Sequence, residues 1–233
     1  MNKPLIVANW KANKTIKEAS EWVRTARTNL EEATEVEVVV CPSHVCLPLV
    51  FSLLGGTSVK LGAQNLSIYE KGAYTGEDTA EMLEGLVTYV IIGHSERRRF
   101  FGEMDQTVAE KTAKALKYKI TPLVCVESLE QVEKFKIFAK DSLDKAIFVY
   151  EPTFAIGTGQ PDTPENAAEM ARKIRQVVDR ETKVLYGGSV ARDNVVDFLF
   201  QADLGGVLVG TASLDPQEFC GLVSSTNYRP MVK

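Results

Sequence analysis

Short apolar runs alternate with amphipathic helical patterns along the whole chain, and this alternation constrains the fold more than any other sequence feature. The runs are rich in β-branched residues and apolar at consecutive positions. Strands buried on both faces have this composition, which is typical of a parallel sheet covered by helices. Eight runs are predicted as strands: Leu5–Asn9, Val36–Cys41, Ser58–Ala63, Tyr89–Gly93, Ile120–Cys125, Ala146–Tyr150, Lys183–Gly187 and Gly206–Val209.

Helical periodicity follows the first, fourth and sixth of these runs. Apolar side chains recur there every three or four residues, so they share one helix face, and we interpret each stripe as core packing. The stripes comprise Ala19, Trp22, Val23, Ala26 and Leu30; Val108, Ala109, Thr112, Ala115 and Leu116; and Ala167, Met170, Ala171, Ile174, Val177 and Val178.

Eight uninterrupted βα units predict an α/β fold, a single (β/α)8 TIM barrel of eight parallel strands forming one domain over residues 1–233. The alternative is an open doubly wound sheet, which usually carries a G-x-G-x-x-G turn after its first strand. Here the first strand ends in Asn9-Trp10-Lys11, without a glycine, and this favours the barrel.

Composition excludes several classes of protein. The chain carries 27 Lys and Arg against 31 Asp and Glu, a net charge of −4, which leaves no basic footprint for nucleic acid. No apolar run reaches the roughly 18 residues of a membrane span, and the N-terminal apolar stretch is too short for a secretory signal. The four cysteines lack metal-binding spacing, which indicates free thiols in a reducing cytosol. We therefore expect a cytoplasmic protein that binds neither nucleic acid nor membranes.

Polar residues gather at the C-terminal ends of the predicted strands, where barrels of this class carry their active sites. Lys11, His94 and Glu151 each follow a strand, and a carboxylate at a buried strand end needs a reason to be there. Taken singly, the lysine could be a solvated rim charge and the histidine a core residue. Together they offer a base, an electrophile and a cation on one face. The same rim carries Asn9, Gln64, Asn65, Ser95, Glu96 and Arg97.

Glycine-rich turns supply a second kind of signal. Gly157-Thr158-Gly159, Gly187-Gly188-Ser189 and Gly210-Thr211 expose backbone N–H groups, and the last two follow strands seven and eight, where many barrels bind phosphate. We predict a small phosphorylated substrate. The rim shows no acidic cluster with metal spacing, so neither a metal nor another cofactor is predicted.

Eight motifs in order along the chain resemble those of the triosephosphate isomerase family, over essentially the whole length. They are Ala8-Asn9-Trp10-Lys11, Leu61-Gly62-Ala63-Gln64-Asn65, Gly72-Ala73-Tyr74-Thr75-Gly76-Glu77, Gly93-His94-Ser95-Glu96-Arg97-Arg98, Tyr150-Glu151-Pro152, Ala155-Ile156-Gly157-Thr158-Gly159, Tyr186-Gly187-Gly188-Ser189-Val190 and Leu208-Val209-Gly210.

This resemblance implies a cofactor-free isomerase that interconverts dihydroxyacetone phosphate and D-glyceraldehyde 3-phosphate through an enediolate, in glycolysis and gluconeogenesis. By position, Glu151 matches the catalytic base, His94 the electrophile and Lys11 the cation near the substrate oxygens. The helix start after His94 is expected to hold its ring neutral. The resemblance also assigns Asn9 beside the lysine, Glu96 as an acidic partner behind the histidine, and Gly157, Ser189, Gly210 and Thr211 as phosphate donors.

The resemblance further implies a mobile lid over Pro152–Asp162 and a homo-oligomer, with a dimer preferred and a tetramer left open by a short region over Ser128–Lys145. The lid residues are Pro152, Phe154, Ile156 and Gly159, and the dimer loop carries Tyr74, Thr75 and Glu77. The chain departs from the family pattern at Phe154, Pro161 and Thr211, and the run Cys125-Val126-Glu127-Ser128 lacks the usual glycine.

The sequence argues against two other functions. A catalytically silent barrel acting as an interaction or structural protein would have no reason to retain Asn9, Lys11, His94 and Glu151 together. A phosphate-binding aldolase needs a Schiff-base lysine in the barrel interior, and only the rim residue Lys11 stands near.

Overall fold

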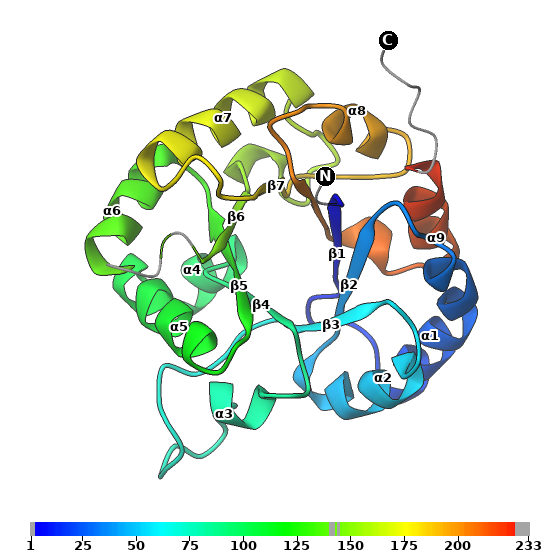
Figure 1. Cartoon of the computed structure of the whole chain (residues 1–233). Helices are drawn as coiled ribbons and strands as arrows, with labels where there is room; N and C mark the ends of the chain where they lie inside the picture. The colour runs from blue at the N-terminus through cyan, green and yellow to red at the C-terminus, as the bar shows by residue number, and fades with distance from the viewer. Residues whose placement is uncertain (1–2, 140–142, 144, 227–233) are drawn as a thin grey trace.

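Eight parallel strands close into a barrel in sequential order, and β1 pairs with both β2 and β8 (Figure 1). The computed structural model describes residues 3–139, 143 and 145–226. The strands are β1 Leu5–Asn9, β2 Glu37–Cys41, β3 Lys60–Ala63, β4 Tyr89–Ile92, β5 Thr121–Val126, β6 Ile147–Tyr150, β7 Val184–Tyr186 and β8 Gly206–Val209.

Helices form a ring outside the barrel (Figure 1). They are α1 Ile16–Glu31, α2 Leu47–Leu54, α3 Ala80–Leu83, α4 Ser95–Phe101, α5 Asp105–Lys117, α6 Leu129–Ala139, α7 Pro164–Val177, α8 Val195–Leu199 and α9 Pro216–Ser225. The predicted TIM barrel is confirmed. No helix in residues 3–139 or 145–226 is long and apolar enough to cross a membrane.

Every predicted strand is present, with small differences in its bounds. The largest is at β3, which starts at Lys60 and not at Ser58. β4 ends before Gly93, because this glycine has φ +70° and leaves the pleated conformation. The helix after β5 spans Leu129–Ala139, although positions 140–142 and 144 of the short region lie outside the described residues.

The strands are continuously apolar because their two faces meet two different cores. On β1, Leu5 and Val7 belong to the barrel interior, whereas Ile6 and Ala8 pack between sheet and helices. The alternation makes Asn9 the inward residue at the carboxyl end, where it is 4 % exposed. The interior cluster comprises Leu5, Val7, Val39, Cys41, Tyr89, Ile91, Leu123, Cys125, Val149, Leu185 and Leu208.

The helical stripes cover the outside of the sheet. All five predicted positions on α1 are buried, and Trp22 meets Trp10 edge-on with ring centroids 4.8 Å apart. On α5 and α7 the stripes are buried at their centres, but Met170, Val177 and Val178 are only partly buried. Because these helices pack against the sheet, the carboxyl ends of the strands hold fixed positions on one rim of the barrel.

Candidate active site

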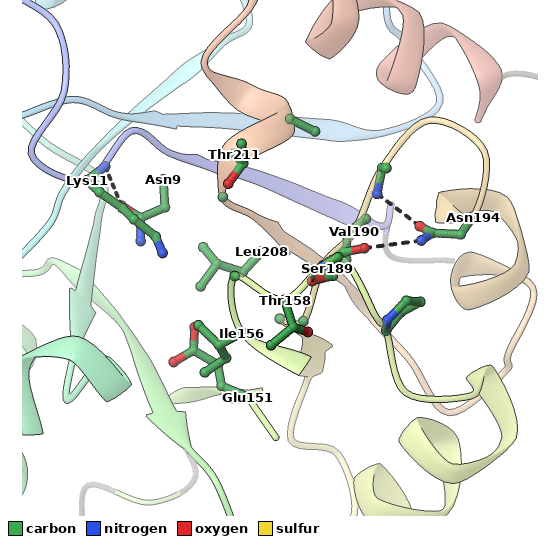
Figure 2. Close-up of a pocket in the computed structure, with 18 of the residues that line it drawn as sticks. Asn9, Lys11, Glu151, Ile156, Thr158, Ser189, Val190, Asn194, Leu208 and Thr211 are labelled. Atoms are coloured by element: carbon green, nitrogen blue, oxygen red, sulfur yellow. Dashed lines mark hydrogen bonds between the residues drawn. The ribbon is translucent and has the colours of Figure 1, made fainter. Parts of the chain in front are cut away.

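A cavity of about 720 Å³ opens at the carboxyl ends of the strands (Figure 2). It brings together side chains and turns that are far apart in the sequence. Of the predicted site residues, its walls contain Asn9, Lys11, His94, Glu151, Ile156, Gly157, Gly159, Ser189, Gly210 and Thr211. Leu208, Val190, Asp193 and Asn194 also line it, and they were not predicted as site residues.

His94 is positioned by a sharp turn after β4. A Cβ on Gly93 would lie 2.8 Å from Cγ2 of Val108, so the turn needs a glycine. His94 then caps α4, and the N–H of Glu96 donates to its Nδ1 over 3.2 Å. A nitrogen that accepts this bond carries no proton, so the neutral ring holds its proton on Nε2.

Glu151 faces that nitrogen from the end of β6. Its Oε1 lies 3.2 Å from Nε2 of His94, and its Oε2 accepts the N–H of Ser95 over 3.3 Å. The carboxylate is 3 % exposed. Burial raises the pKa of Glu151, but His94, the Ser95 N–H and the Cys125 thiol outweigh it, and the net pKa lies below the usual range. Glu151 is therefore ionised and able to accept a proton.

Opposing influences act on the pKa of His94. Burial and, to a smaller extent, Lys11 lower it, while the carboxylates of Glu151 and Glu96 raise it, and the net direction is upward. The expectation that the helix start alone keeps this ring neutral was incomplete, because it omitted the carboxylate. The hydrogen bond from Glu96 to Nδ1 favours the neutral form, and the balance depends on the charge of Glu151.

Lys11 stands in the left-handed backbone region, with φ 54°. Its N–H donates to Oδ1 of Asn9 over 3.0 Å, and Nε2 of Gln64 donates to its carbonyl over 2.9 Å. These bonds hold a conformation that costs of order 1–3 kcal/mol by itself. Gln64 was predicted only as a rim residue, yet it fixes the lysine backbone.

Glu96 lies beside both Lys11 and His94. Its Oε1 forms an ion pair with Nζ of Lys11 at 2.5 Å, whereas Oε2 lies 3.7 Å from Nδ1 of His94. The histidine is bound by the backbone amide of Glu96, and the carboxylate orients the lysine.

Turns after β6, β7 and β8 line a further part of the cavity. They contribute Gly157, Ser189, Gly210 and Thr211, the residues predicted as phosphate donors. Ser189 has φ 50°, and its carbonyl accepts Nδ2 of Asn194 over 3.1 Å. Asn194 gave no signal in the sequence because its role is to brace a turn five residues earlier.

The Pro152–Asp162 segment lines the cavity over Ile156–Gly159 and at Pro161. Its Ile156 lines the same cavity as Glu151 and Leu208 (Figure 2). The N–H of Gly159 donates to Oγ of Ser189 over 3.1 Å, and the N–H of Asp162 donates to the Tyr186 hydroxyl over 2.7 Å. Of the predicted lid residues, Pro152 is buried and Phe154 is 61 % exposed.

The predicted dimer loop projects away from the barrel between β3 and α3 (Figure 1). Tyr74, Thr75 and Glu77 are all exposed. Tyr74 stacks on Tyr69 with ring centroids 3.9 Å apart and an interplanar angle of 6°. The N–H of Ser67 donates to the carbonyl of Asp78 over 2.9 Å and closes the neck of the loop.

Candidate metal ligands do not cluster in the described part of the chain, where no group of three or more His, Cys, Asp or Glu could hold an ion. The four cysteines are buried and free. In the cavity itself, the carboxylate of Glu151 and the imidazole of His94 lie beside the fixed cation of Lys11, an arrangement able to transfer protons.

Comparison with known proteins agrees with this geometry. The family model described as triosephosphate isomerase matches residues 4–226. A triosephosphate isomerase of Aquifex aeolicus is 40% identical over 243 aligned positions, which cover 95% of this chain and 98% of that protein. Those of Clostridium botulinum (strain Loch Maree / Type A3) and Alkaliphilus oremlandii are 41% identical over 248 positions, covering 96% of this chain and 100% of each relative.

Proposed function

The chain belongs to the triosephosphate isomerase family and interconverts dihydroxyacetone phosphate and D-glyceraldehyde 3-phosphate, and we propose that the cavity at the carboxyl rim is its active site. The observation that carries the proposal is the 3.2 Å approach of the Glu151 carboxylate to Nε2 of His94 in that cavity. Turnover of glyceraldehyde 3-phosphate in a coupled assay tests the activity. Loss of that turnover on changing cavity residues tests the site.

Glu151 is the base in this proposal. The reaction moves a proton between two adjacent carbons, and one carboxylate can serve both because it has two oxygens. The lowered pKa of Glu151 keeps it ionised, and burial keeps water away from the carbanionic intermediate. Ile156 and Leu208 supply the apolar part of this environment.

His94 is the electrophile. Nε2–H donates to a substrate oxygen as the enediolate forms, and the neutral ring gives and retakes a proton between the two oxygens. When Glu151 takes the carbon proton it loses its charge, and the largest of the influences that raise the pKa of His94 disappears, while that of Glu96 remains. Proton transfer to the base therefore favours the neutral form of His94 at the step that needs a neutral ring.

Lys11 supplies positive charge for the developing oxyanion, and Asn9 lies beside Lys11. Glu96 holds the ammonium group at 2.5 Å, so its position is fixed before substrate binds. The side chains of Asn9 and Gln64 also hydrogen-bond the backbone of Lys11, and these two bonds support the preorganisation of the lysine.

In this proposal the backbone N–H groups of Gly157, Ser189, Gly210 and Thr211 donate hydrogen bonds to the phosphate oxygens of the substrate. Thr211 keeps its amide, although its side chain adds bulk that a glycine would lack. The segment Pro152–Asp162 acts as the lid, and Gly157 joins the phosphate site from it.

A homodimer is proposed from the projecting loop with Tyr74, Thr75 and Glu77. Two exposed apolar side chains lie near the end of this loop. Met82 in α3 is 62 % exposed, and Val45 is 68 % exposed next to His44, whose Nδ1 lies 2.5 Å from Oδ2 of Asp78. Such side chains at the base of a projecting loop indicate a protein–protein contact.

We also propose that residues 1–233 form one domain, and that the enzyme works in the cytoplasm, where its free thiols stay reduced.

A further inference from the structure

Thr153, at the start of the lid, is tied by its side chain to the segment after β5. Its Oγ1 donates to Oε2 of Glu127 over 2.8 Å. The lid leaves β6, which lies between β5 and β7 in the barrel. Ser189 and Tyr186 hold the lid from the β7 side. The pair of Thr153 and Glu127 holds it from the β5 side.

Glu127 is itself fixed in place. Its N–H donates to Oε1 of Gln131 over 2.9 Å, and the N–H of Gln131 donates to Oγ of Ser128 over 3.3 Å, so the start of α6 orders this turn. One residue earlier, the carbonyl of Val126 accepts the N–H of Glu151 over 2.8 Å. The backbone that carries the Glu127 side chain is thus hydrogen-bonded to the end of β6, where the base Glu151 lies.

The aromatic side chain beside this tie does not anchor the lid. Phe154 is 61 % exposed and has no polar atom in its ring. Within the described chain, Thr153 is the one residue of Pro152–Phe154 whose side chain hydrogen-bonds outside the lid. The start of the lid is therefore held by the bond between the Thr153 hydroxyl and the Glu127 carboxylate, together with the bond from Oγ of Ser189 to the carbonyl of Ala155 over 2.6 Å.

We propose that Glu127 is a positioning residue for lid closure, acting through the hydroxyl of Thr153. The proposal rests on the assignment of Pro152–Asp162 as the lid. An open lid admits water and releases the enediolate, which then expels its phosphate. The C–O bond to phosphate breaks, phosphate leaves with the electron pair, and the remaining enol becomes methylglyoxal. The fraction of turnovers ending as methylglyoxal and inorganic phosphate therefore reports closure.

The test removes each partner of the bond separately. Thr153→Val deletes the hydroxyl with little change in volume, and Glu127→Ala deletes the acceptor. Each is expected to raise the elimination fraction about 3- to 10-fold, the effect of one hydrogen bond to an exposed charged group. The double variant should match the larger single effect, since both remove the same bond. Thr153→Ser and Glu127→Gln keep a donor and an acceptor and should restore the wild-type fraction.

Glu130→Ala is the matched control, because it deletes a nearby exposed carboxylate that pairs with Lys134 instead. An equal rise in this control, or additive effects in the double variant, overturns the proposal. If Thr153→Val and Glu127→Ala leave the elimination fraction unchanged while deletion of Ile156–Gly159 raises it, the lid assignment is kept and the proposed role of the Thr153–Glu127 hydrogen bond is refuted. If the deletion also changes nothing, the lid assignment itself is wrong.

Discussion

Glu151→Gln replaces one buried oxygen with an NH₂ group and removes the charge that accepts the substrate proton. In the wild-type structure Oε1 of the carboxylate faces Nε2–H of His94 and Oε2 accepts the N–H of Ser95, with the Cys125 thiol as a further donor. The amide has a single oxygen, so one donor is left facing another donor. That arrangement costs about 1–3 kcal/mol, partly offset because a buried charge is also removed. The variant should remain folded, since domains of this kind have about 5–15 kcal/mol of stability.

The expected loss of kcat is about 10²–10⁴-fold or more, the usual contribution of a placed general base. Glu151→Asp keeps the charge but withdraws the carboxylate by about 1.5 Å, one C–C bond. Because roughly 1 Å of misplacement can cost about 10²-fold, this variant should also be impaired.

The assay is coupled turnover in both directions, together with hydrogen exchange at the reacting carbons in D₂O followed by NMR. Exchange isolates proton abstraction from later steps. Glu21→Gln is the control, since this carboxylate lies on the outer face of α1, 63 % exposed. A folded Glu151→Gln enzyme that turns over within about tenfold of wild type, and still exchanges carbon-bound hydrogen, would refute the assignment of the base.

Three further outcomes are expected. Deleting Ile156–Gly159 should depress isomerisation and raise the fraction of methylglyoxal; an unchanged fraction contradicts a lid. Sedimentation at micromolar concentration should give a species heavier than the 25.7 kDa chain, and Tyr74→Asp should shift it toward that mass; a single 25.7 kDa wild-type species contradicts the dimer. Hydrogen bonds from Lys114, Lys117 and Tyr118 lower the pKa of Glu70 to about 2. Its stabilisation is therefore complete above the ordinary carboxyl pKa and lost as pH falls toward 2, so the difference in unfolding free energy between wild type and Glu70→Gln should shrink over that range. A difference that stays constant would disprove the linkage.

The sequence by itself determined the barrel and the rim positions of the reactive side chains. Strand and helix periodicities are local properties, set by which face of each element is buried, so eight strands could be predicted to within two residues at each end. Since parallel strands share a direction, a residue placed after a strand must lie on the carboxyl rim. Lys11, His94 and Glu151 were found in this way, whereas the lid over Pro152–Asp162 was implied by the resemblance to the triosephosphate isomerase family.

Only the tertiary structure decided which atoms meet. Lys11 and Glu96 stand 85 positions apart, and no periodicity shows that this carboxylate binds the lysine while its amide binds His94. Gln64, Asn194 and the Thr153–Glu127 pair brace backbone in neighbouring loops, where lengths and turns vary without a repeating pattern. The protonation balance at His94 likewise depends on a carboxylate from another strand 3.2 Å away. Such effects fall steeply with distance, so they follow from packing and not from the order of residues.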